Sequence, residues 1–122
     1  MKSILLLVCT IIGVTCYSQT IDIPDKNFEL ALIEKGIDSD KTVNGVLLRT
    51  DAQLVTFLDV NNKQIQSLKG IEAFTSLKYL DCRNNYLTRL NLNSNLALET
   101  LFNDVNNTIQ YKNSRELLSW FY

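Results

Sequence analysis

Two acidic residues, Asp59 and Asp81, are the pair in this sequence best placed for acid–base chemistry. They occupy the same position in two segments of similar pattern, at an offset of 81 minus 59, or 22 residues. On adjacent strands their carboxylates would lie about 5 Å apart, close to the spacing in retaining glycosidases. That chemistry also needs a cleft that excludes water and raises one pKa, whereas an open sheet leaves both acids solvated and ionised. A carbohydrate-active enzyme using Asp59 and Asp81 is therefore only an alternative hypothesis.

Other catalytic and metal-binding patterns are missing or incomplete. The chain has no histidine, which removes the common catalytic triads, histidine bases and histidine-containing zinc sites. Asp38 and Asp40 resemble the start of a calcium loop, but Val43 stands where that loop needs glycine and Arg49 where it needs glutamate. We therefore predict no metal site, no cofactor and no enzymatic activity.

Composition is that of one small globular domain. The 122 residues are 46% hydrophobic, and 12 basic and 13 acidic residues are scattered along the chain without a block of one sign. Nucleic-acid binding depends on clustered lysine and arginine. We therefore expect no nucleic-acid partner.

The candidate residues belong to a unit that repeats. Its clearest copy is Leu77–Leu98, LKYLDCRNNYLTRLNLNSNLAL, and the preceding segment Val55–Leu68, VTFLDVNNKQIQSL, has the same apolar positions. A further copy starts at Leu98, 98 minus 77 or 21 residues on. A period in the twenties with the pattern LxxLxLxxN is typical of leucine-rich repeats. The sequence predicts an α/β fold, a short leucine-rich-repeat solenoid with a narrow parallel sheet, in residues 55–110.

Alternation along each predicted strand separates a core side from an outward side. Structural positions are expected to face inward, and they are Leu58, Val60, Leu80, Cys82, Leu87, Leu90 and Leu101. Three columns are expected outward: Phe57, Tyr79 and Thr100; Asp59, Asp81 and Phe102; Asn61, Arg83 and Asp104. Because aromatic and arginine residues most often anchor interfaces, we predict a binding surface at Phe57, Asp59, Asn61, Tyr79, Asp81, Arg83 and Phe102. The other interpretation is a solvated sheet face without a partner.

Asparagines fill the last position of the repeat motif. Asn85 and Asn106 are expected to bond backbone groups of the tight turn and of the next coil. The first repeat has Lys63 in this slot, with Asn62 one place early, and the third has Asn103 where an inward hydrophobe is expected. The second repeat is thus the complete one.

The N-terminus has the features of an export signal. Lys2 precedes an apolar run too short to span a bilayer, and residues 1–18 are predicted to be a signal peptide cleaved after Ser18. A lipid anchor at Cys16 is the competing interpretation. Cleavage leaves Cys82 as the only thiol, which we interpret as a small buried hydrophobe rather than a reactive group.

Residues 19–54 are predicted to form an N-terminal helical cap. Its helix is expected from about Asp25 to Lys35, and Asn44-Gly45 marks a tight turn. Thr50 or Asp51 is expected to cap a single helical turn. In residues 111–122, a capping-box pattern predicts a short C-terminal helix that closes the solenoid, the alternative being a scar of truncation.

The repeats and the segment before them, about residues 21–107 and especially GIEAFTSL at Gly70–Leu77, resemble bacterial leucine-rich-repeat surface proteins of the internalin type. The resemblance implies an exported, helix-capped recognition or adhesion module and not a catalyst.

We therefore expect a non-enzymatic extracellular or cell-envelope module that binds a protein or glycan on the concave face of its sheet, with no membrane contact after signal cleavage. The alternative is a truncated remnant of a longer surface protein without independent function. Nine outward positions fall short of the roughly 20 to 30 residues per side of a standard interface, so binding by this face alone should be weak.

Overall fold

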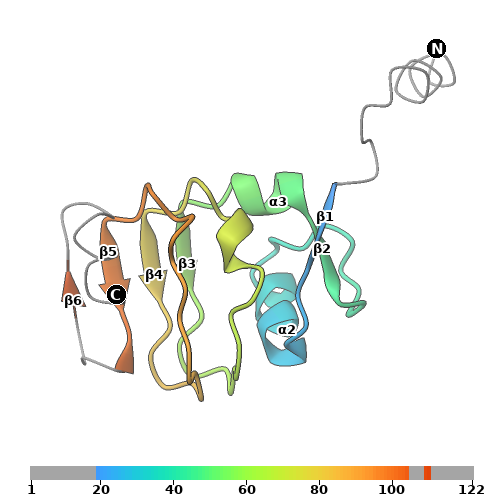
Figure 1. Ribbon diagram of the computed structural model, residues 1–122. Coiled ribbons are helices and arrows are strands. Elements are labelled where there is room, and N and C mark those ends of the chain that lie inside the picture. The colour runs from blue at the N-terminus through green and yellow to red at the C-terminus, as the bar shows by residue number, and fades with distance from the viewer. Residues whose placement is uncertain (1–18, 105–108, 111–122) are drawn as a thin grey trace, which may run out of the picture.

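The computed structural model describes residues 19–104 and 109–110. Figure 1 shows a row of short strands on one side and a helix with a two-stranded sheet on the other. Within the described ranges, no helix has both the length and the apolar character needed to cross a bilayer. The predicted signal peptide, Asn106 and the predicted C-terminal helix lie outside the described residues.

Three parallel strands form the row: β3 (Phe57–Asp59), β4 (Tyr79–Asp81) and β5 (Thr100–Phe102). They run in the same direction in Figure 1. Between one strand and the next the chain returns along the opposite side of the row of strands, and we call residues 60–78 and 82–99 the first and second return segments. Phe57 pairs with Tyr79 and Tyr79 with Thr100, which confirms the register predicted from the repeat spacing. A short strand that was not predicted, β6 (Ile109–Gln110), pairs antiparallel with β5.

The central residue of each parallel strand is fully buried. Leu58, Leu80 and Leu101 share one hydrophobic cluster with Val60 and Cys82, as the alternation predicts. Burial of each large aliphatic side chain contributes on the order of 2 kcal/mol, so this cluster is the main stabilising feature of the repeats.

Two predicted core positions are less buried than expected. Leu87 and Leu90 were expected to be buried, but they are only partly buried and pack against the edge of the cluster. Both line a cavity on the C-terminal side of the second coil, so part of their surface has no neighbour among the described residues. Asn103 lies inward, at the position that Val60 and Cys82 occupy in the preceding coils.

The segment between β3 and β4 contains a short 3-10 helix, η1 (Ile71–Ala73), whose Ile71 and Ala73 are buried. A buried asparagine that the sequence analysis missed, Asn95, joins the two return segments. Its side-chain nitrogen donates to the carbonyl oxygens of Ile71 at 2.9 Å and Phe74 at 3.1 Å. The first coil, which starts at β3, and the second coil, which starts at β4, are therefore linked on the side away from the sheet as well.

The N-terminal part consists of β1 (Thr20–Asp22), α2 (Lys26–Glu34), β2 (Val46–Leu48) and α3 (Arg49–Gln53). Helix α2 confirms the predicted helix to within one residue at each end. The antiparallel pairing of β1 with β2 was not predicted. The assignment of Thr50 or Asp51 as a cap was wrong, because α3 begins at Arg49 after Leu48 and both residues lie inside it.

Asp25 connects α2 to the first coil. Its Oδ1 accepts hydrogen bonds from the backbone N–H groups of Asn27 and Phe28 at the helix start, as expected of an N-cap. Its Oδ2 accepts hydrogen bonds from the N–H groups of Gln66 and Ser67 at 2.8 and 2.9 Å. One carboxylate therefore satisfies four backbone donors in two elements distant in sequence.

Apolar contacts complete this junction. The rings of Phe28 in α2 and Phe74 in the first return segment lie 6.3 Å apart and are both fully buried. Gly70 lies directly against Ile23. The exposed ion pair between Lys63 and Glu34 at 2.7 Å adds little, because solvent screens it.

Two buried carboxylates order the loop between α2 and β2. Glu29 accepts hydrogen bonds from the N–H groups of Asn44 and Gly45 and so holds the turn predicted there. Asp38 is also buried, and one of its oxygens, Oδ2, has no hydrogen-bond partner among the described residues. Burial, then the hydrogen-bonded contact with Asp40 and its charge, raises the pKa of Asp38 to about 6.

Gly70→Ala should destabilise the junction by about 3 kcal/mol. Gly70 has a φ of 106°, and an added Cβ would overlap Cδ1 of Ile23 and lie 2.8 Å from the backbone oxygen of Asp22. Gly45→Ala is the matched control, because its φ is 81° with open space around it, and it should cost only about 1 kcal/mol. Urea unfolding measures both, and equal losses would contradict the close packing of Gly70.

Asp38→Asn should stabilise the protein at pH 7 by about 1 kcal/mol. In the folded protein the pKa of Asp38 is about 6, above its ordinary value of 3.8. Protonated Asp38 therefore favours the folded state, and this contribution is fully present below about pH 4. That stability is lost as the pH rises through 6. Asparagine is neutral throughout, so its advantage should disappear by pH 4.

Urea unfolding at pH 7, 5.5 and 4 measures this dependence. Asp22→Asn removes the same charge from an exposed position and should show no such trend. An advantage of Asp38→Asn that is equal at pH 4 and pH 7 would rule out the buried ionised carboxylate as its cause.

Candidate functional site

Aromatic side chains form a continuous row across the outward face of the parallel strands. The rings of Phe57 and Tyr79 are stacked, with centroids 4.3 Å apart and an interplanar angle of 10°. Phe102 continues the row, its centroid 5.5 Å from that of Tyr79 at 47°. Phe102 belongs to the predicted column of Asp59 and Asp81, because the residue of β5 that pairs with Tyr79 is Thr100. The fold therefore brings together the three predicted aromatic residues.

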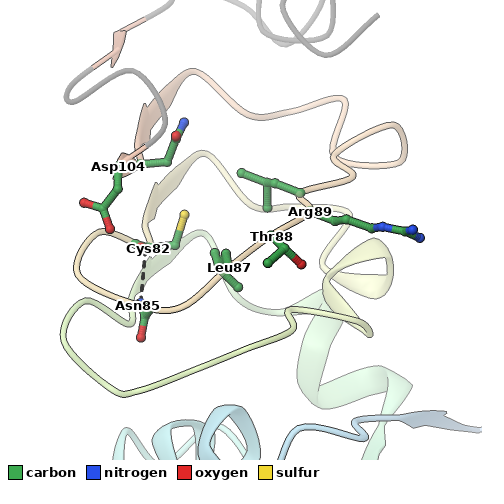
Figure 2. Close-up of a pocket in the computed structure, with 8 residues that line it drawn as sticks. Cys82, Asn85, Leu87, Thr88, Arg89 and Asp104 are labelled. Atoms are coloured by element: carbon green, nitrogen blue, oxygen red, sulfur yellow. Dashed lines mark hydrogen bonds between the residues drawn. The ribbon is translucent and has the colours of Figure 1, made fainter.

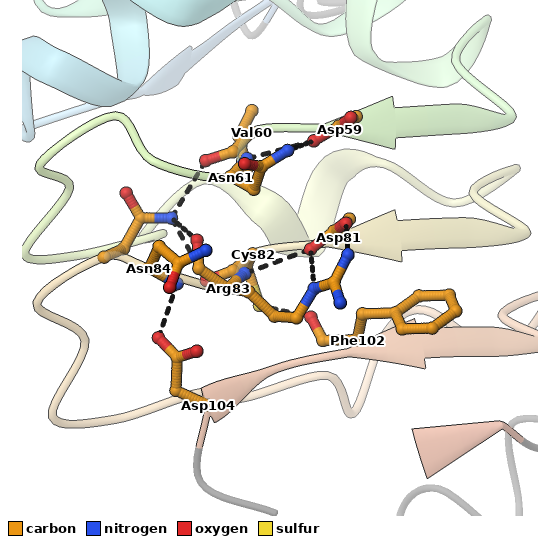
Figure 3. Close-up of polar contacts among 10 residues, drawn as sticks. Asp59, Val60, Asn61, Asp81, Cys82, Arg83, Asn84, Phe102 and Asp104 are labelled. Carbon is orange, nitrogen blue, oxygen red and sulfur yellow. Dashed lines mark hydrogen bonds and ion pairs between the residues drawn. The ribbon is translucent and has the colours of Figure 1, made fainter. Parts of the chain in front are cut away.

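Asp81 and Arg83 form an ion pair at one end of this row (Figure 3). Nε of Arg83 donates to Oδ1 of Asp81 at 3.0 Å, and Nη2 donates to Oδ2 at 2.7 Å. The guanidinium carbon lies 4.9 Å from the ring centroid of Phe102, a cation–π distance. Asp81 is only 2% exposed, so the expectation that both strand carboxylates are solvated was wrong. The side chain of Arg83, which bonds both of its oxygens, contributes to this burial.

Asp59 has a different environment, although it pairs with Asp81 in the sheet. From the part of the chain that the structure describes, its carboxylate accepts two hydrogen bonds. Both come from Asn61, one from the backbone N–H and one from the side chain, and both reach Oδ1. Burial alone would raise the pKa of Asp59, but these hydrogen bonds and the charges of Lys35 and Arg83 hold it below the usual value. Asp59 is therefore ionised at neutral pH.

Tyr79 is influenced by the charges of both carboxylates. Burial, followed by the charges of Asp81 and Asp59, raises the pKa of its phenol. Its hydroxyl is therefore a neutral group at neutral pH, available as a hydrogen-bond donor on the outward face.

Asn85 fixes the turn that follows β4. Its side-chain nitrogen donates to the carbonyl oxygens of Cys82 and Arg83 in its own coil and of Val60 in the preceding coil. Its oxygen accepts hydrogen bonds from the N–H groups of Lys63 and Ile65, both at 3.0 Å. Among the described residues, the partners outside its own turn lie in the preceding coil, whereas the prediction placed them in the next coil.

Asn62 has a different role from the one its position suggested. It corresponds to Asn84, at an offset of 84 minus 62, or 22 residues. Both adopt left-handed backbone, with φ of 55° and 57°, which asparagine tolerates better than most residues. The N–H of Asn84 also donates to Oδ2 of Asp104 at 2.5 Å (Figure 3). Asn62 is therefore the turn residue of the first coil, not a displaced ladder residue.

An open groove of about 430 Å³ lies beside β3, and sequence analysis did not predict it. It adjoins the face of the sheet on the side of Phe57 away from β4, because its lining comes from β3 and the segments before it. The lining residues are Lys35, Ile37, Val55, Thr56, Phe57 and Asp59. Only the last two were predicted as binding residues.

A second cavity, of about 220 Å³, lies on the core side of the second coil (Figure 2). Cys82, Asn85, Leu87 and Leu90 contribute to its wall, with Asp104 at its C-terminal edge. The chain that follows Asp104 lies outside the described residues, so this cavity carries no functional assignment. Among the described residues, no group of three or more acidic or cysteine side chains is arranged to hold a metal ion.

Comparison with known proteins gives matches to solved structures alone. No protein-family model and no curated protein matches the chain. The functional domain of InlJ from Listeria monocytogenes, described as including a cysteine ladder, matches with a TM-score of 0.60 and 28% identity. That match covers 75% of this chain and 21% of the InlJ chain.

An internalin, InlF, from Listeria monocytogenes strain 4b F2365 matches with a TM-score of 0.47 and 24% identity, over 66% of this chain and 27% of that one. This chain thus spans about a fifth and about a quarter of the two matched chains. The fold is a mixed α/β fold similar to that of the InlJ repeats.

The native protein should protect Cys82 from thiol reagents. Its side chain is 1% exposed, and burial, followed by the charges of Asp81 and Asp104, raises the pKa of Cys82 to about 12. In a chain with Cys9→Ala and Cys16→Ala, Ellman's reagent should label Cys82 in urea. Labelling without urea should be at least about 100-fold slower, because the buried thiol reacts only after a local unfolding that costs on the order of 3 kcal/mol. Fast labelling of the native chain would contradict the inward position of the thiol.

Proposed function

We propose that this internalin-like leucine-rich-repeat protein is a non-enzymatic recognition module that binds a protein or glycan partner with the outward face of its parallel sheet. The observation that carries the proposal is the aromatic row of Phe57, Tyr79 and Phe102 with Arg83 against it. Aromatic and arginine side chains dominate the energetics of interfaces. The similarity to a region of InlJ described as functional supports the same role.

The row is suited to recognition because it is held rigidly before any partner binds. Phe57 and Tyr79 pack face to face, and the carboxylate of Asp81 holds the guanidinium of Arg83 with two hydrogen bonds. A surface with few side chains left to order loses less conformational entropy when it binds.

We infer that the three coils are a short solenoid, repeats 55–110, and that residues 19–54 cap its first coil. Helix α2 covers that coil through the contact of Phe28 with Phe74, and Asp25 bonds the N–H groups of Gln66 and Ser67. Terminal caps of this kind protect the apolar edge of repeat proteins. The cap and the sheet face then form one continuous surface beside β3.

The geometry does not support the carbohydrate-active alternative. Both oxygens of Asp81 already accept hydrogen bonds from Arg83, and the pKa of Asp59 is lowered. A general acid of a glycosidase needs a raised pKa. The carboxylate of Asp81 therefore serves to position Arg83 on the surface.

We further propose that the module acts outside the cytoplasm, in the cell envelope or beyond the cell. The support is the signal-peptide pattern of residues 1–18, which lies outside the described residues, and the internalin-like fold. Scattered charge and a net charge of -1 favour a protein or glycan over nucleic acid.

Photocrosslinking tests the face that binds. A photoreactive phenylalanine analogue replaces Phe102 in one version of the chain and, as a control, exposed Lys69 on a return segment in another. We expect cells that export the protein, or their culture medium, to yield a discrete adduct from position 102 but not from position 69. Equal adducts from both positions, or none from position 102, would contradict recognition by this face.

A further inference from the structure

At the groove beside β3, one face of an aromatic ring on the outward side of the sheet is open to a partner. Phe57 is 60% exposed although Tyr79 covers one face of its ring. The groove lies against the other side, where Lys35 and Ile37 follow helix α2 and Val55 precedes the strand. The remaining rings of the row are already in contact: Tyr79 lies between Phe57 and Phe102, and Phe102 has Arg83 over it.

This arrangement distinguishes between the two classes of partner. A sugar ring binds to aromatic residues by lying flat on an exposed ring face. In the row, the stacked faces of Phe57 and Tyr79 are only 4.3 Å apart, so a sugar does not fit between them. The one open ring face, on Phe57, can stack a single flat group, and the carboxylate of Asp59 beside it favours a cationic side chain over a neutral sugar ring.

Charge identifies the kind of side chain. Asp59 lines the groove, and both of its hydrogen bonds from Asn61 arrive at Oδ1. Among the described residues no hydrogen bond reaches Oδ2, so Oδ2 is available for a further donor. Asp81, by contrast, is fully engaged by Arg83. Of the two carboxylates on paired strands, Asp59 is the one that can accept an external cation.

We propose that the groove binds an arginine side chain of a protein partner, with its guanidinium stacked on Phe57 and donating to Asp59. A guanidinium is planar, stacks on aromatic faces and donates to carboxylates, so it matches both groups. Ile37 and Val55 contact its aliphatic part. The contact between Arg83 and Phe102 beside Asp81 shows the same combination of groups within the chain itself.

Lys35 is the competing cation. It lies in the groove wall, and its charge contributes to the lowered pKa of Asp59. In the free protein, Lys35 offsets part of the negative potential that an arriving arginine would experience. Removing its charge should therefore strengthen binding of an arginine, whereas it would weaken binding of an anionic group.

Titration of the full chain with N-acetyl-arginine amide, followed by amide chemical shifts in NMR spectra, tests this proposal. We expect saturable shifts at Val55, Phe57 and Asp59 with a dissociation constant in the millimolar range, as for a small weak ligand. N-acetyl-citrulline amide has nearly the same shape without charge and should bind at least about five-fold more weakly.

Three variants sharpen the result. Asp59→Asn should weaken binding of the arginine amide about five-fold or more, and Lys35→Met should strengthen it about two- to five-fold. Asp22→Asn, which removes a carboxylate from exposed β1, should leave it unchanged. Equal binding of citrulline, weaker binding by Lys35→Met, tighter binding of a methyl glycoside at the same residues, or no saturable shift would each overturn the proposal.

This inference rests on the proposed function, and the crosslinking experiment separates the two. If position 102 crosslinks a protein equally well with Asp59 intact and in the Asp59→Asn variant, recognition by the face stands and the arginine site fails. If position 102 gives no adduct, the proposed function fails whatever the small probe does.

Discussion

The constraint on which the structure depends is that backbone groups at the coil turns must find partners inside the protein. Strands of three residues supply few sheet hydrogen bonds, and the chain turns soon after β3 and β4. Asn85 satisfies five backbone groups, three in the preceding coil and two in its own turn. An unpaired buried group costs about 1 to 3 kcal/mol, so one side chain determines the spacing of two coils. Asp25 does the same where α2 meets the first coil.

That spacing determines the surface. Adjacent strands lie roughly 4.8 Å apart, a distance that brings aromatic rings at paired positions into contact. Phe57 and Tyr79 stack for this reason, and the same spacing places Arg83 over Phe102. Ring faces in the middle of the sheet are consequently occupied by neighbours, and an open face remains at the edge formed by β3. The unequal environments of Asp59 and Asp81 follow from the same geometry, since Arg83 engages one carboxylate and Asn61 only one oxygen of the other.

Periodicity made the repeats predictable from the sequence, and contacts without a period were missed. The offsets of 22 and 21 residues were enough to predict the pairing of Phe57, Tyr79 and Thr100 and the burial of the inward residues. The repeat offsets gave no information about the pairing of β1 with β2 or about the groove beside Lys35. Both features involve segments that are not repeated in the sequence. The burial of Asp81 was missed because solvation was inferred from strand direction alone, while Arg83, two residues further on, folds back over it.

The small sheet also limits how this protein can bind. The three parallel strands give a face about 10 Å across, well short of a standard interface. Interface energy is concentrated in a few well-packed residues, so a narrow face can still be specific if one pocket binds an anchor tightly. At the edge beside β3 the cap adds surface to the sheet, through Lys35 and Ile37. In this protein the cap therefore has two effects: it covers the core of the first coil, and it forms the second wall of a groove whose first wall is the sheet.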